Sequence, residues 1–84
     1  MIRLFNIAIQ YQGTYLLARV AEFRHSPTTY FVTFRDHWNI EVPEEVILNT
    51  KKGKLGLADN SSPIDATMLK LVIQKIEEHL PLFQ

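Results

Sequence analysis

The segment SPIDATMLKLVIQKIEEHL, residues 62–80, decides the fold because it carries a complete helical signature from start to stop. Ser62 is the expected N-cap, Pro63 the first helical residue, and Asp65 closes a capping box three residues after the cap. Pro81 is expected to end the helix. Apolar side chains recur at helical spacing and form one stripe, which consists of Ile64, Met68, Leu69, Val72, Ile73, Ile76 and Leu80.

This apolar stripe needs a surface to pack on, and the preceding residues are predicted to form an antiparallel sheet. Residues 2–12 and 14–23 read as two strands around Gln12-Gly13. A two-residue loop pairs Tyr11 with Thr14 and places Arg3 opposite Glu22 as a pair of opposite charges. A three-residue loop with a left-handed Gly13 would slip the register by one residue and exchange the faces of the second strand. The first register is favoured, and it puts Phe5, Ile7, Ile9, Leu16, Ala18 and Val20 on one face.

The opposite face of this hairpin is also partly apolar. It carries Leu4, Ala8, Tyr15, Leu17, Ala21 and Phe23.

A second hairpin is predicted from residues 29–34 and 38–42, with a loop at residues 35–37. In this register Phe34 pairs with Trp38, Val32 with Ile40 and Tyr30 with Val42, all on one face, while Phe31, Thr33, Asn39 and Glu41 lie on the other.

Residues 43–60 allow two readings. In the first, residues 46–48 and 55–58 are short strands of a third hairpin, joined across residues 50–53. In the second, residues 43–48 form a helical turn that begins at Pro43. Residues 59–61 are a turn-forming linker to the helix.

The predicted architecture is one α+β domain over residues 1–84, with a four- to five-stranded antiparallel meander and one C-terminal amphipathic helix packed on one face. A helix covers about 10 Å of width, less than four strands at about 4.8 Å spacing, so part of the apolar sheet surface should stay uncovered. Such a surface predicts a homo-oligomer or an unknown protein partner. The candidate interface residues are Leu4, Tyr15, Leu17 and Phe31.

Composition narrows the classes of function. The 84 residues are 46% hydrophobic and carry nine Lys plus Arg against nine Asp plus Glu. A zero net charge argues against binding to nucleic acid or to an anionic membrane. The chain contains no cysteine, which excludes disulfides, thiolate metal sites and a cysteine nucleophile. Its first ten residues do not read as a signal peptide, and no run is long enough to span a membrane, so a cytoplasmic location is expected.

The residue types that could carry chemistry do not form a recognised motif. His25, His37 and His79 are not at metal-ligand spacing, and Gly53-Lys54-Leu55-Gly56 lacks the setting of a phosphate-binding loop. The segment Arg35-Asp36-His37-Trp38 offers an acid, a base and a cation, but a turn alone explains its composition. We therefore predict no catalytic residue, no metal and no cofactor.

Three functions remain open. The first is a non-enzymatic module for protein interaction or dimerisation, through an uncovered sheet face or an edge strand. The second is a single-stranded nucleic-acid binder that uses Tyr15 and Phe31 for stacking. In that reading the strand arginines Arg19, Arg24 and Arg35 would contact phosphates. The third is a small-ligand binder or enzyme around Asp36 and His37.

The segment Phe5–Tyr15, in which alternating apolar residues lead into a Tyr-Gln-Gly turn, resembles the first hairpin of short uncharacterised bacterial proteins. The resemblance covers about the first quarter of the chain. It implies no activity and carries over no functional residue.

Overall fold

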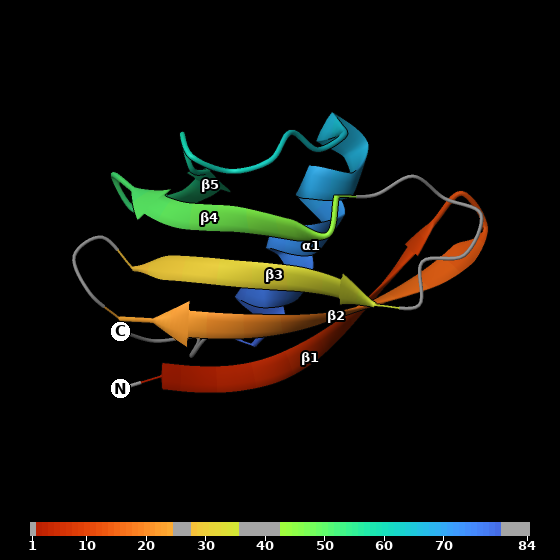
Figure 1. Cartoon of the computed structure of the whole chain (residues 1–84), viewed down its shortest axis with the longest axis horizontal. Coiled ribbons are helices and arrows are strands. Elements are labelled where there is room, and N and C mark those ends of the chain that lie inside the picture. The colour runs from red at the N-terminus through yellow and green to blue at the C-terminus, as the bar shows by residue number, and fades with distance from the viewer. Residues whose placement is uncertain (1, 25–27, 36–42, 80–84) are drawn as a thin grey trace.

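The computed structural model describes residues 2–24, 28–35 and 43–79, which form five strands and one helix (Figure 1). The sheet is an antiparallel meander with the strand order β1-β2-β3-β4-β5. Helix α1 lies on one face, called here the inner face (Figure 1). The predicted α+β architecture is confirmed, with bounds β1 Ile2–Tyr11, β2 Thr14–Phe23, β3 Thr29–Arg35, β4 Glu45–Lys51, β5 Lys54–Leu57 and α1 Ala66–Glu78.

Two tight turns set the register of the first and last hairpins, β1–β2 and β4–β5. Gln12 and Gly13 have φ angles of 52° and 76°, positive at both positions as a type I′ turn requires. Tyr11 therefore pairs with Thr14, which confirms the two-residue loop between β1 and β2. Lys52 and Gly53, with φ angles of 54° and 78°, join β4 to β5 in the same way. The third hairpin is thus formed, and the helical turn considered for residues 43–48 is not.

The partner predicted for β3 is wrong. Val32 lies between Val20 of β2 and Val46 of β4, so both edges of β3 are occupied by strands other than the predicted one. Val46 and Leu48 alternate with the same period as residues 38–42, so the apolar pattern alone does not distinguish the two candidate partners. The predicted strand Trp38–Val42 lies outside the described residues. The predicted faces of β3 are right, because Tyr30, Val32 and Phe34 are buried.

The inner face forms the core with the helix. Met68, Val72 and Ile76 of α1 pack against it and are almost fully buried. The sheet residues of this core, which share the inner face, are Ile7, Ile9, Leu16, Ala18, Val20, Tyr30, Val32, Phe34, Val46 and Leu48.

Strand β1 contacts both ends of the helix. The Tyr11 hydroxyl donates to Asp65 Oδ2 at the start of α1 over 3.1 Å, and Arg3 Nη2 donates to the His79 carbonyl at its end over 3.2 Å. Desolvation, and then the hydrogen bond to the Asp65 carboxylate, raise the pKa of Tyr11. The edge strand β5 also contacts α1. On the described part of the inner face no large apolar side chain is exposed, so the uncovered apolar surface that was expected there is absent.

The helix begins later than its sequence predicts. Asp65, not Ser62, is the N-cap, and its side chain accepts from the backbone N–H groups of Thr67 and Met68 at 3.0 and 3.2 Å. The neighbouring Ser61 hydroxyl accepts from the Ile47 backbone N–H at 2.9 Å, which holds the linker against β4 in a non-helical conformation. The helix ends at Glu78. Leu80 and Pro81, the predicted last residue and stop, lie outside the described residues.

Candidate interaction surface

The face of the sheet opposite α1, called here the outer face, carries a row of apolar side chains across four strands. The register places Leu4 beside Ala21, Ala21 beside Phe31, and Phe31 beside Ile47. The adjacent row, nearer the first residue of β3, contains Ile2 beside Phe23. The Phe23 ring packs edge-on against the Phe31 ring, with ring centroids 5.2 Å apart. These two rows are therefore largely apolar, although the face of an antiparallel sheet that is turned away from the core is ordinarily polar.

Exposure of large apolar side chains is concentrated on one hairpin of this face. Within the described residues, the exposed large hydrophobic side chains are those of Ile2, Leu4, Tyr15 and Leu17, with exposed fractions of 54%, 62%, 67% and 47%. All four belong to β1 or β2 and to the outer face. An apolar cluster of this kind marks an interaction surface more often than a scatter of single residues does.

Polar residues divide this apolar surface into two parts. A row of Asn6, Arg19, Thr33 and Glu45 lies between the Leu4 row and the residues nearer the hairpin turn, where Ala8 pairs with Leu17. A shallow open hollow lies between the polar row and the apolar side chains beside Leu4. It is lined by Arg19, Ala21, Phe23, Phe31, Thr33 and Glu45. On one side of the polar row lie Ile2 and Leu4, and on the other Leu17 and Tyr15.

The four predicted interface residues, Leu4, Tyr15, Leu17 and Phe31, all lie on the outer face. The structure brings Leu4 and Phe31 into one row but separates Phe31 from Tyr15. Phe31 pairs with Ala21, and Tyr15 precedes Ala21 by six residues on β2, about 20 Å along the strand. The two rings therefore form no shared stacking platform. Sequence reasoning omitted Ile2, although its alternation with Leu4 places it on the same face.

The second group of interacting residues surrounds a buried carboxylate on the inner face. Glu22 is 1% exposed, and its Oε1 lies 3.1 Å from Nε of Arg3 and 3.1 Å from Nε of Arg24. Arg24 donates a hydrogen bond, whereas Arg3 is held as an ion pair without hydrogen-bond geometry at Nε. Glu22 Oε2 accepts from the Tyr30 hydroxyl at 2.9 Å.

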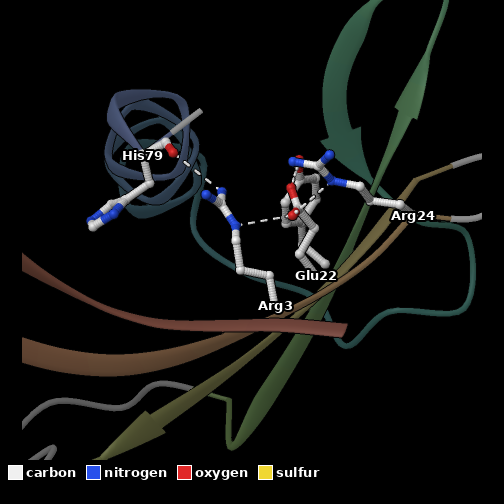
Figure 2. A network of polar contacts seen from close by, with 5 residues as sticks. Arg3, Glu22, Arg24 and His79 are labelled. Atoms are coloured by element: carbon white, nitrogen blue, oxygen red, sulfur yellow. Dashed lines mark hydrogen bonds and ion pairs between the residues drawn. The ribbon is translucent and has the colours of Figure 1, made fainter. Parts of the chain in front are cut away.

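This set of residues, called here the Glu22 network, joins the sheet to the end of the helix. Arg3 lies between the Glu22 carboxylate and the His79 carbonyl (Figure 2). The His79 ring stacks on Phe5 with ring centroids 4.5 Å apart, and the Arg3 guanidinium lies 4.9 Å from the centre of the same Phe5 ring. Burial, then the bond to Glu22, raises the pKa of Tyr30 to about 12. Because the carboxylate is inaccessible and its charge is matched by arginines, its role is structural.

The sequence predicted one contact of this network, the pair between Arg3 and Glu22. It missed Tyr30, which pairs with Glu22 only in the β2–β3 register. It also missed the contact of Arg24 with Glu22, because Arg24 directly follows the last residue of β2 and reads as part of the loop.

Most of the other predicted candidates for chemistry are not among the residues that the structure describes. His25, Asp36 and His37 lie outside the described residues, and His79 belongs to the helix end described above. In residues 2–24, 28–35 and 43–79 no three His, Cys, Asp or Glu side chains are grouped as a metal site would require.

Within these same residues, no helix has the length and apolar character needed to cross a membrane.

Comparison of the chain with protein-family models, with curated proteins and with solved structures gave no match.

Proposed function

We propose that this chain is a non-enzymatic protein-interaction module whose binding surface is the outer face of the β1–β2 hairpin, and that its partner is a second copy of the same chain. The observation that carries the proposal is the gathering of Ile2, Leu4, Tyr15 and Leu17 on this one face, where each side chain is about half exposed or more. Covering these side chains removes apolar area from water, which favours association. A net charge of zero adds no long-range repulsion between copies. The cytoplasmic location expected from the sequence is part of this proposal.

The test is the solution mass of the protein over a concentration series, measured by light scattering behind size exclusion. We expect a dimer whose association is insensitive to salt, because apolar burial is not screened. The variant Leu17→Lys places a charge among the exposed apolar side chains of the proposed surface and should weaken association at least about tenfold. Gln74→Lys adds the same charge to an exposed position on α1 and is the matched control.

Equal association of Leu17→Lys and Gln74→Lys would contradict the proposed surface, and a wild-type monomer at every concentration would contradict the homodimer.

A single-stranded nucleic-acid binder is the second candidate, supported by exposed Arg19 and Arg35 on the same face. A salt-dependent change in the anisotropy of a labelled mixed-sequence oligonucleotide, lost in Arg19→Ala, would favour that candidate instead.

A further inference from the structure

Strand β1 is an edge of the sheet, and the adjacent turn determines which of its backbone groups are free of β2. In a two-residue I′ hairpin the residues that flank the turn, here Tyr11 and Thr14, form a hydrogen-bonded pair. Hydrogen-bonded pairs then recur at every second residue of an antiparallel ladder. The backbone N–H and C=O groups that point away from β2 are therefore those of Ile2, Leu4, Asn6, Ala8 and Gln10.

In the described part of the chain, β1 itself lacks most of the features that commonly prevent an edge strand from pairing with another chain. Natural edge strands are commonly blocked by lysine, proline, bulges or inward-pointing charges. The ten residues of β1 include neither lysine nor proline, and their pairing with β2 is continuous. The one charged residue, Arg3, points to the inner face, where it forms an ion pair with Glu22 and donates from Nη2 to the His79 carbonyl.

We infer that β1 pairs antiparallel with β1 of a second copy, about a two-fold axis that passes through Asn6. This inference rests on the proposed homodimer and places its contact at the β1 edge, so that the outer faces of the two copies lie side by side on one surface of the joined sheet. Asn6 faces Asn6 of the partner subunit, Leu4 faces the partner's Ala8, and Ile2 faces the partner's Gln10. The five outward-pointing residues of each copy supply about ten backbone hydrogen bonds, which join the two sheets into one.

This register unites the two apolar parts of the outer face that the polar row separates in one copy. Leu4 comes beside the partner's Ala8, which itself pairs with the partner's Leu17, so the small Ala8 lies between two exposed leucines. Ile2 comes beside the partner's Gln10, which pairs with the partner's Tyr15. The four exposed apolar side chains thus join into rows that continue across the two-fold axis.

A neighbouring register is less complementary. Centring the two-fold axis on Ile7 would place Leu4 opposite the partner's Gln10 and Asn6 opposite the partner's Ala8. Each apolar side chain would then face a polar one. Centring on Asn6 instead matches amide with amide and apolar with apolar at the three central pairs.

The absence of cysteine from the chain allows a direct test of this register. At the two-fold axis the Cα atoms of Asn6 and its mate should lie about 5.5 Å apart, within disulfide reach. The variant Asn6→Cys should therefore form an intermolecular disulfide under mild oxidation. In Ala8→Cys the introduced thiols should be about 13 Å apart and should not cross-link, which makes this variant the matched control. Both positions face solvent on the outer face, so neither substitution enters the core.

The variant Asn6→Pro tests the backbone pairing itself. The Asn6 N–H points away from β2, so proline removes no hydrogen bond of the monomer and is tolerated on such an edge. It removes the central pair of hydrogen bonds in the dimer and should raise the dimer dissociation constant at least about 30-fold, whereas Asn6→Ala should change it only a few-fold. Circular dichroism verifies that each variant is folded.

The outcomes separate the inference from the proposed function. If Leu17→Lys weakens the dimer but Asn6→Cys does not cross-link, the outer face binds the partner and the edge-pairing geometry is overturned. If Asn6→Cys cross-links while Leu17→Lys associates normally, the edge pairs and the apolar face is not the binding surface. Cross-linking of Ala8→Cys as fast as Asn6→Cys overturns the register, and amide exchange at Leu4, Asn6 and Ala8 that does not slow with protein concentration overturns the pairing.

Discussion

Replacing Glu22 by Gln tests whether the Glu22 network stabilises the fold. The amide keeps the size of the carboxylate and can still accept the Tyr30 hydrogen bond, but that bond changes from charge-assisted to neutral, a loss of about 1 kcal/mol. The side chains of Arg3 and Arg24 are 40% and 59% exposed, so water screens both ion pairs and each contributes about 0.5–1 kcal/mol. We therefore expect the free energy of unfolding to fall by about 2–3 kcal/mol at neutral pH.

Urea denaturation followed by far-ultraviolet circular dichroism measures this change, with the slope of the transition required to stay constant. Glu77→Gln, at an exposed position on α1, removes the same charge and should cost less than about 0.5 kcal/mol. If Glu22→Gln is as stable as Glu77→Gln, hydration of the two arginines compensates fully for their lost ion pairs, and the Glu22 network does not stabilise the fold.

Two further predictions concern the helix cap and the buried tyrosine. Asp65→Ala should lower stability by about 1–2 kcal/mol because its carboxylate accepts from two helix N–H groups and from Tyr11, while Ser62→Ala should be near neutral in thermal denaturation; equal losses would make Ser62 the cap. The pKa of Tyr30 is raised from 10.0 to about 12, so its contribution is complete below pH 10 and is lost as the pH rises through 12. The stability difference between wild type and Tyr30→Phe should therefore shrink over this window, and a difference that stays constant from pH 9 to 12 would contradict the assigned hydrogen bond.

Local pattern sufficed for the β1–β2 hairpin. Apolar side chains recur at every second residue of both strands, and with a glycine in the turn two registers were considered; pairing Arg3 with Glu22 favours the one observed. The placement of Leu4, Tyr15, Leu17 and Phe31 on one face follows from the same period of two.

Local pattern did not suffice where two segments of similar sequence compete for one position. Residues 38–42 and residues 46–48 offer β3 the same apolar alternation, and the shorter loop made the wrong partner look better. Ser62 and Asp65 are both good capping residues, and the choice between them depends on the contact of Ser61 with β4, which is distant in sequence. The Glu22 network was only half predictable for the same reason, because Tyr30 reaches Glu22 through the register of β2 with β3.

The contact of β1 with both ends of α1 has a consequence for synthesis on the ribosome. Arg3 and the His79 carbonyl are 76 positions apart in the chain, so this contact cannot form until nearly all of these residues have been translated. Until then the inner face of the sheet, which carries most of the buried side chains, has no helix to cover it. The nascent chain therefore exposes an apolar surface and a strand edge at the same time, a combination that chaperones recognise and that favours aggregation. Closure of the core is a late event that the last helix of the described chain completes.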